Sequence, residues 1–187
     1  MGERFNFIRM KLNDVIIIEK RYAEDARGSF GRLFCANEFK EIGLKKKIVQ
    51  INHSTTKEKG TVRGLHFQYP PFAELKIITC MKGEIFDVAI DIRSGSKTFL
   101  DWHGEIISAE NKKSIVIPEG FAHGFQTLSN DCELIYMHTN LYKKAAEGGL
   151  HVRDKKIGIK WPLPIKNLSE KDQSFKFIGD DYSGVKL

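Results

Sequence analysis

The sequence contains little cysteine and no long hydrophobic run. Its 187 residues include only Cys35, Cys80 and Cys132, with no CxxC pair, and each sits within an apolar stretch. Such cysteines are typical of buried free thiols in a reducing compartment, so we expect a cytoplasmic protein. The apolar run that follows the basic N-terminal residues, VIII at 15–18, is too short for a signal peptide or a membrane span, and no membrane contact is expected.

Long segments with the 3.6-residue period of helices are also lacking. Instead, GEIFDVAIDI at 83–92 alternates with the two-residue period of a strand. Similar short runs, most of them separated by Gly, Asn, Asp or Pro, occur at 14–19, 47–52, 61–67, 75–82, 102–108, 113–118, 124–128 and 132–140. Only 36–44 and 169–174 look helical. This pattern predicts one all-β domain over residues 1–187, a double-sheet sandwich or jelly-roll barrel with small peripheral helices and an irregular C-terminal part.

Positive charge is in excess, with a formal net charge of +6 and a pI near 9.1. Its densest run, LKKKI at 44–48, lies beside a strand-like segment and is typical of a solvated loop. No basic amphipathic helix or RNA-binding signature accompanies it, so no nucleic-acid partner is expected. An acidic surface or a small phosphorylated ligand remains compatible with the charge.

The stretch GTVRGLHFQYPPFAELK at 60–76 places Arg63, His66 and Lys76 in an otherwise apolar region. Strict alternation would send Arg63 and His66 to opposite faces of a strand. Gly64 between them is compatible with a bulge that brings both side chains to one cavity. His66 could then be a buried structural imidazole, a metal ligand or a base.

IPEGFAHGF at 117–125 is similar to the second motif of the cupins, P-x-G-x-x-H, and delivers His123 at the start of a strand. A metal-binding cupin also needs an H-x-H pair, and Gln68 stands where its second histidine would be. Glu74 follows without a compensating histidine, so we expect a metal-free cupin. His123 either fixes a loop by a hydrogen bond or donates to a polar ligand.

ELIYMHTNLY at 133–142 places Leu134, Tyr136 and His138 on one face of a strand. A tyrosine in a β-rich core usually packs with its hydroxyl satisfied. Tyr136 gains a chemical role only if it faces His66 across a pocket.

Several blocks together resemble the dTDP-4-dehydrorhamnose 3,5-epimerase family, in order, from about Asp25 to Asp172: QINHSTTKEKGTVRGLHFQ, GEIFDVAIDIRSGSKTF, ISAEN, IPEGFAHGF, GIKWPLP and LSEKDQ. The resemblance implies a cupin-type double-stranded jelly roll that needs no metal or cofactor. It implies a homodimer in which the N-terminal segment of one subunit reaches into the site of the other. The implied substrate is a nucleoside diphosphate 4-keto-6-deoxy sugar, deprotonated at carbons 3 and 5 and reprotonated on the opposite face.

The same resemblance assigns the chemistry. His66 matches the family's general base, and Asp172 matches the carboxylate that orients it. Lys76 matches the cation beside the ketone oxygen, where enolate charge develops, and Tyr136 matches the acid. The implied substrate contacts are Arg63 to the diphosphate, His123 near the sugar, Gln50, Asn52 and Ser54 along the approach to the ligand, Lys171 near phosphate, and Arg27 and Phe30 in the N-terminal segment.

Two positions depart from the family pattern. Arg32 stands where the family's D-x-R-G-x-F-x-E motif has a glutamate that recognises thymidine. An arginine donates well to the O6/N7 edge of guanine, which suggests GDP-linked 4-keto heptoses of capsule synthesis as an alternative substrate class. Leu141 replaces a tyrosine that often precedes the one matched by Tyr142, which leaves open the sugar and whether both carbons are inverted.

Two other functions stay open. One is a non-catalytic cupin that binds a nucleotide sugar, although such a binder has no need of a base, an orienting carboxylate, an oxyanion partner and an acid together. The other is a 3,4-ketoisomerase on a related cupin, which would leave the proton at carbon 5 unexchanged.

Overall fold

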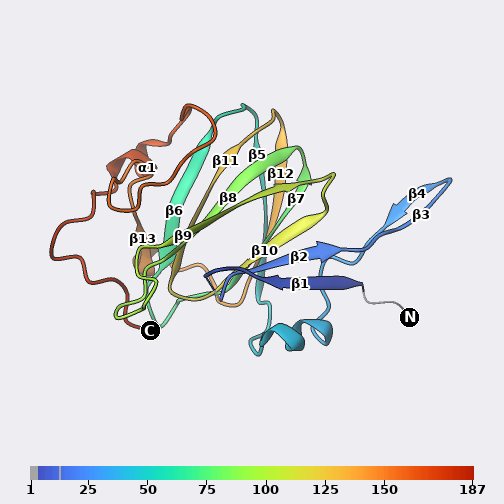
Figure 1. The fold of residues 1–187 in the computed structure, drawn as a ribbon, viewed down its shortest axis with the longest axis horizontal. Helices are drawn as coiled ribbons and strands as arrows, with labels where there is room; N and C mark the ends of the chain where they lie inside the picture. Colours follow the sequence, from blue (N-terminus) through green and yellow to red (C-terminus); the bar gives the residue numbers. More distant parts are fainter. Residues whose placement is uncertain (1–3, 13) are drawn as a thin grey trace.

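Two antiparallel sheets form the body of the protein, as a computed structural model of residues 4–12 and 14–187 describes it (Figure 1). The six-stranded sheet has the order β1 (Phe5–Arg9), β2 (Ile16–Lys20), β10 (Lys113–Ile117), β7 (Lys76–Lys82), β12 (Cys132–His138) and β5 (Gln50–Thr56). The five-stranded sheet has the order β13 (Glu147–Gly149), β6 (Val62–Gln68), β11 (Phe121–Thr127), β8 (Glu84–Asp91) and β9 (Trp102–Ser108). The crossing between sheets by consecutive strands makes this an all-β, cupin-type double-stranded jelly roll.

Every strand-like run of the sequence overlaps a strand of these sheets. The strand β5 begins three residues later than the run at 47–52 predicts, and β1 and β13 were not predicted. The two helical segments are confirmed as the 3₁₀ helix η1 (Glu38–Ile42) and the α-helix α1 (Glu170–Ser174), and a further 3₁₀ turn, η2, covers Lys144–Ala146.

Three apolar layers hold the sheets. Ile17, Ile78, Ile85 and Phe125 belong to the layer between the two sheets. A second layer lies where the five-stranded sheet meets the C-terminal segment, and a third includes Phe39 of η1 on the six-stranded sheet. In β8 the apolar parity of Phe86, Val88 and Ile90 packs in the second layer, whereas Ala89 belongs to the layer between the sheets. The strand's other parity, which also carries Asp87, therefore faces the interior of the sandwich.

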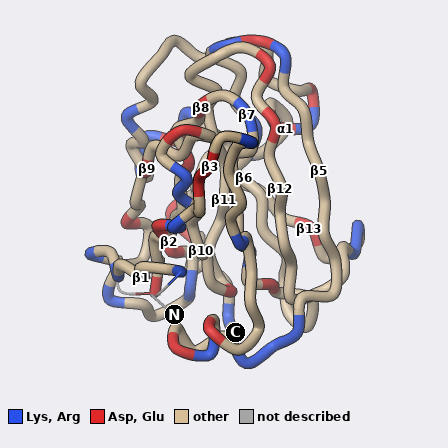
Figure 2. The backbone as a smooth tube through the Cα atoms, turned by 90° about the vertical axis from the view of Figure 1, so that its right-hand side faces the viewer, with Lys and Arg blue, Asp and Glu red and all other residues tan. Residues whose placement is uncertain are grey.

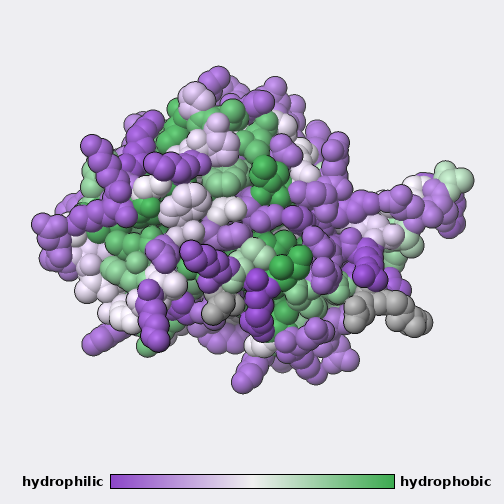
Figure 3. Space-filling view, in the orientation of Figure 1, coloured by the Kyte–Doolittle hydropathy of each residue, from purple (hydrophilic) through white to green (hydrophobic). Residues whose placement is uncertain are grey.

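A two-stranded arm stands away from this body (Figures 1 and 3). It consists of β3 (Ala23–Asp25) and β4 (Gly28–Phe30), which pair with each other and with no other strand of the described residues. The Arg27 side chain, in the turn at the tip, is 90% exposed, and Phe30, at the end of the arm nearer the body, is 71% exposed. Side chains so exposed gain little from folding of the chain that carries them.

Charged residues are interspersed on the surface, and both signs occur in the loops around the sheets (Figure 2). The three lysines of 45–47 are exposed in a loop, as predicted. All three cysteines are free, with Cys80 and Cys132 buried but Cys35 only partly so, which corrects its expected burial. No helix in the described part of the chain is long and apolar enough to span a membrane.

Candidate active site

A pocket of about 280 Å³ lies between the two sheets. Strand alternation supplies one wall, because Asn52 and Ser54 of β5 point the same way and stand opposite Tyr136 and Leu134 of the neighbouring strand β12. The six-stranded sheet also contributes Lys76 to the lining. From the five-stranded sheet come, among others, Arg63, His66, Phe67, Gln68, His123 and Phe125.

An irregularity in β6 brings Arg63 and His66 to this pocket, as the glycine between them suggested. His123 of β11 pairs with His66, and Phe125 pairs with Arg63, so that three steps along β6 match two steps along β11. The extra residue reverses the parity of the strand at that point. Gly64 has a φ of 136°, and a Cβ there would lie 2.5 Å from the Cα of Gly124, so this close approach of the two strands requires glycine.

His66 and Asp172 form a hydrogen-bonded pair. The His66 Nε2 lies 2.6 Å from Asp172 Oδ1, and the main-chain N–H of Gly64 donates to the other carboxylate oxygen at 3.3 Å. Ser169 caps α1 by accepting the N–H of Asp172 at 3.1 Å, which fixes the carboxylate over β6. Burial is the largest single influence and opposes ionisation of Asp172, but the hydrogen bond and charge of His66, together with the hydrogen bonds from Gly64 and Ser169, outweigh it and lower the pKa of the carboxyl group.

His123 has a carboxylate of its own. Its Nε2 lies 2.9 Å from Asp87 Oδ2, and Asp87 is fully buried between the sheets. We predicted no role for Asp87, although a charged residue on the interior parity of β8 is a signal that could have identified it. The contact with Asp87 therefore fixes the His123 ring, which lines the pocket.

Tyr136 lies on the opposite sheet from His66 and lines the same pocket. Its ring centroid is 6.1 Å from that of His123, and its hydroxyl lies 3.5 Å from Ser54 Oγ. Burial raises the pKa of Tyr136 well above its usual range, so the phenol keeps its proton at neutral pH. Tyr136 can therefore act as a proton donor, because its phenolate form is disfavoured.

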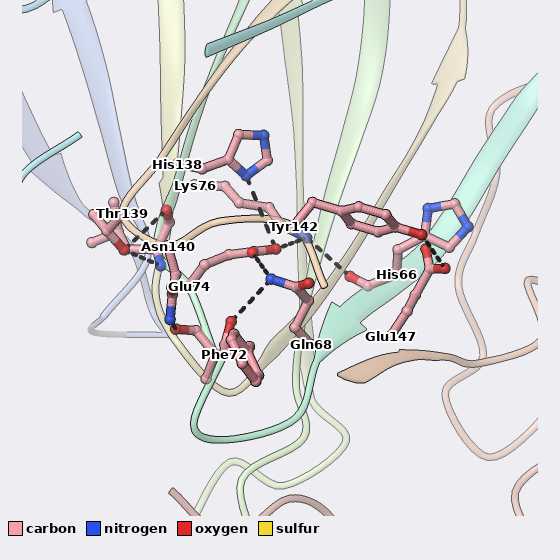
Figure 4. Close-up of polar contacts among 12 residues, drawn as sticks. His66, Gln68, Phe72, Glu74, Lys76, His138, Thr139, Asn140, Tyr142 and Glu147 are labelled. Carbon is pink, nitrogen blue, oxygen red and sulfur yellow. Dashed lines mark hydrogen bonds and ion pairs between the residues drawn. The ribbon is translucent and has the colours of Figure 1, made fainter. Parts of the chain in front are cut away.

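Lys76 reaches the pocket from β7 and is nearly buried. Its Nζ lies 3.2 Å from Glu74 Oε1 and donates to the main-chain oxygen of His66 at 3.3 Å (Figure 4). His138, which pairs with Lys76 across the two strands, also lines the pocket. The sequence assigned no function to Glu74 or His138.

Other proposed substrate contacts lie at the edge of the pocket or outside it. Gln50 does not line it but donates to Asn52 Oδ1 at 3.1 Å. Lys171 lines a neighbouring cavity that shares Arg63 and His66 with the pocket, and its Nζ pairs with Glu147 at 2.5 Å. Glu147 in turn accepts from the hydroxyl of Tyr142, so these two pocket-lining residues are tied to α1.

The arm residues do not reach the pocket of their own chain. Arg27 pairs with Asp25, and Phe30 is exposed at the end of the arm nearer the body. Arg32 pairs with Glu38 of η1 at 2.6 Å. Leu141 departs from the family pattern in a way that left the identity of the sugar open. Its side chain is exposed and does not line the pocket.

Over residues 4–12 and 14–187, no group of three or more His, Cys, Asp or Glu side chains is arranged to hold a metal ion. The side chains that line the pocket offer proton transfer and charge stabilisation. Two imidazole–carboxylate pairs, a protonated phenol and an ammonium group surround one cavity.

The sequence also matches a known protein family along most of its length. The family model described as dTDP-4-dehydrorhamnose 3,5-epimerase matches residues 9–180. The chain belongs to this family. The matched range contains the pocket and both imidazole–carboxylate pairs, and it includes the arm.

Relatives of the family are similar over nearly their whole length. The dTDP-4-dehydrorhamnose 3,5-epimerase of Shigella flexneri is 46% identical over 179 residues, covering 95% of this chain and 98% of the relative. That of Salmonella typhimurium is 47% identical, covering 88% and 91%. A crystal structure of the Legionella pneumophila epimerase in complex with dTDP-4-keto-L-rhamnose superposes with a TM-score of 0.91 at 37% identity, covering 98% of each chain.

Proposed function

We propose that this protein is an isomerase that inverts carbons 3 and 5 of a dTDP-linked 4-keto-6-deoxy sugar. The observation that carries the proposal is one pocket in which a base paired with a carboxylate, His66, lies on one sheet and a protonated phenol, Tyr136, lies on the other. Family membership supports the substrate class, because similar chains are named as dTDP-4-dehydrorhamnose 3,5-epimerases.

Proton removal is assigned to His66. Its Nε2–H donates to Asp172, which leaves Nδ1 as the unprotonated ring atom that takes the proton from carbon. The ketone at carbon 4 acidifies the protons on both neighbouring carbons. The ionised Asp172 then stabilises the imidazolium that forms.

We assign to Lys76 the stabilisation of the negative charge that develops on the ketone oxygen. A nearly buried ammonium fixed beside the sugar favours the enolate more than the neutral ketone, and this difference accelerates the reaction. His123, whose Nε2 pairs with Asp87 Oδ2, lies near the same polar region of the sugar. Tyr136 then returns a proton from the face opposite His66, which inverts the carbon.

The nucleotide end of the substrate lies beyond the sugar pocket. We assign the diphosphate to Arg63, whose guanidinium is exposed at the pocket and donates to the main-chain oxygen of Thr55 at 3.0 Å, with Lys171 beside it in the adjoining cavity. We favour dTDP over GDP because Arg32 is engaged by Glu38 and because the Legionella relative binds a dTDP sugar. Asn52 and Ser54, with Gln50 behind them, line the approach.

We further propose a homodimer in which the arm of one subunit completes the site of its partner. Arg27 and Phe30 are strongly exposed on an arm that stands clear of its own body. Val49, Ile51 and Met81, on or beside strands of the six-stranded sheet, are exposed apolar side chains that a partner would cover.

Proton exchange in deuterated water tests the chemistry. Incubation with dTDP- and GDP-linked 4-keto sugars, followed by NMR, is expected to show deuterium at carbons 3 and 5 of a dTDP sugar. His66→Ala should abolish this exchange. Survival of exchange in that variant contradicts the assignment of the base, and exchange at carbon 3 alone indicates a single epimerase. A parallel titration that finds GDP bound more tightly than dTDP would reverse the choice of nucleotide.

Mixed dimers test the arm. His66→Ala and Arg27→Ala subunits, each expected to have low activity alone, are unfolded together, refolded and assayed. In a mixed dimer one site has both His66 and an intact arm, so about a quarter of the wild-type activity should return. No recovery, with dimers present by ultracentrifugation, contradicts exchange of the arm.

A further inference from the structure

Glu74 is a buried carboxylate that the proposed proton transfers do not use. It lines the pocket, yet its side chain is only 7% exposed. Figure 4 shows it between Lys76, Gln68 and His138. Its oxygens lie 3.2 Å from Lys76 Nζ and 4.0 Å from His138 Nδ1, and the amide of Gln68 donates to it. A buried charge of this kind is costly unless it is paired and hydrogen-bonded, as Glu74 is.

The first effect of Glu74 is on the direction of Lys76. An ammonium group has three N–H donors. One is taken by Glu74 Oε1 and a second by the main-chain oxygen of His66 at 3.3 Å. Both acceptors belong to the pocket walls, so the third donor is left for a ligand in the pocket. Without Glu74 the ammonium would have one anchor and could rotate.

Glu74 is itself held in place. The amide nitrogen of Gln68 also lies 3.0 and 3.2 Å from the main-chain oxygens of Phe72 and Leu141, so its two N–H groups are shared among three acceptors, and its oxygen accepts from the N–H of Lys143 at 2.6 Å. Gln68 therefore ties the carboxylate to two loops and to β6. A carboxylate anchored in this way provides a fixed reference for the flexible lysine side chain.

The second effect of Glu74 passes through His138. Burial, followed by the charges of Lys76 and His123, lowers the pKa of His138 to about 4, so the ring is neutral at neutral pH. The amide nitrogen of Asn52 lies 3.3 Å from His138 Nε2, and since the amide donates, this ring atom must accept. The ring proton is then on Nδ1, the atom that faces Glu74.

A chain of donors with one direction results. Gln50 donates to Asn52 at 3.1 Å and Asn52 donates to His138, whose Nδ1 lies 4.0 Å from Glu74 Oε1, too far for a hydrogen bond but close enough for the carboxylate charge to favour an N–H on that atom. Gln50 is fixed in turn by the N–H of Tyr142, which it accepts at 3.0 Å. The negative charge of Glu74 near Nδ1 favours the Nδ1–H tautomer of His138, and this tautomer leaves Nε2 to accept from the Asn52 amide at the pocket surface.

We propose that Glu74 is a positioning residue for the sugar: it aims the free N–H of Lys76 at the ketone oxygen and, through His138, orients Asn52. The inference rests on the proposed function, because the aim of Lys76 matters only if a ketone lies against it. The effect of Glu74 on the tautomer of His138 can be measured without any reaction.

Glu74→Gln tests the proposal with a nearly isosteric side chain. We expect kcat for deuterium exchange to fall by about one order of magnitude or more, because the ammonium is no longer aimed. The dissociation constant of dTDP, which lacks the 4-keto sugar, should change by less than about a factor of two. In ¹⁵N NMR of histidine-labelled protein, the His138 signal, assigned by its loss in His138→Asn, should report Nδ1–H in the wild type and lose that pattern in the variant.

Glu105→Gln is the matched control. Glu105 forms a half-buried pair with Lys113 at 2.8 Å, outside the pocket, so its removal should leave both kcat and the His138 signal unchanged. An unchanged kcat or an unchanged His138 tautomer in Glu74→Gln overturns the proposal. If that variant does not fold, Glu74→Asp, which keeps the charge but withdraws it by one methylene, should lower kcat and retain Nδ1–H, and wild-type kcat in it is the contradicting result.

The two proposals fail in different ways. A wild-type protein that exchanges no proton of any 4-keto sugar removes the proposed function, while the NMR measurement still decides whether Glu74 sets the tautomer of His138. Exchange by the wild type with full activity of a folded Glu74→Gln variant removes the role of Glu74 and leaves the epimerase intact.

Discussion

Asp172→Asn separates the orienting role of the carboxylate from its charge. Asparagine has nearly the same shape, so its oxygen can still accept from His66, but its amide nitrogen cannot accept the N–H of Gly64 and it cannot stabilise an imidazolium. The two residues approach to 2.6 Å, and the Asp172 side chain is 4% exposed while that of His66 is 33% exposed, so solvent screens the pair only in part. A hydrogen bond to a charged group contributes about 1.5–3 kcal/mol, and a unit ion pair in a partly screened site about 4 kcal/mol. A loss of about 2–4 kcal/mol from the transition state corresponds to a roughly 30- to 1000-fold fall in rate.

The assay for this variant is the rate of deuterium uptake at carbons 3 and 5, with dTDP binding and the thermal unfolding midpoint as controls. We expect slow uptake at both carbons, because one base serves both, with dTDP affinity retained. Uptake within about threefold of the wild-type rate in a folded variant would falsify the view that Asp172 stabilises a His66 imidazolium.

The remaining predictions concern the same pocket. Lys76→Met removes the donor to the developing oxyanion and should lower kcat by about 10²- to 10³-fold, measured by the same exchange; a wild-type kcat contradicts that role. Tyr136→Phe should still take up deuterium, returned on the face of His66, but should form no inverted sugar; inversion at a normal rate by chiral analysis of the product refutes the acid assignment. The folded pKa of Asp172 lies below its usual 3.8, so its contribution to stability is present above that pH and is lost as the pH falls below it; urea unfolding of the wild type and of Asp172→Asn should therefore converge in acid. Gly64→Ala places a Cβ 2.5 Å from Gly124 Cα at a φ of 136° and should destabilise the fold by about 1–3 kcal/mol in urea unfolding, and an unchanged midpoint contradicts the close approach.

Strand alternation made much of the pocket wall predictable from the sequence. Once Tyr136 and His138 are placed on one face of a strand, the same rule gives the common face of Asn52 and Ser54. The bulge at Gly64 was also readable, since glycine in a strand between two polar residues permits the change of parity that unites Arg63 with His66. These features depend on local backbone geometry, which short stretches of sequence determine.

Contacts between distant strands were not predictable in the same way. Asp87 meets His123, and Glu74 meets His138, only because the register of β8, β11, β7 and β12 brings them together. Nothing in the local pattern gives that register. Charged side chains near the pocket had a similar ambiguity: Arg32 and Lys171 were expected at the ligand, yet each pairs with a glutamate of its own chain, Glu38 and Glu147. Ligand binding at Lys171 must therefore compete with an existing ion pair.

A pocket between two sheets suits the proposed inversion for a geometric reason. Stacked sheets lie about 10 Å apart, so a pocket between the facing side chains of two sheets has room for one sugar ring. An enolate is planar, so inversion needs a base on one face and an acid on the other. His66 and Tyr136 come from different sheets, and each is held by its own strand register and by contacts to Asp172 and Ser54. The fold thus supplies both faces at once, and neither side chain has to cross the ring during the reaction.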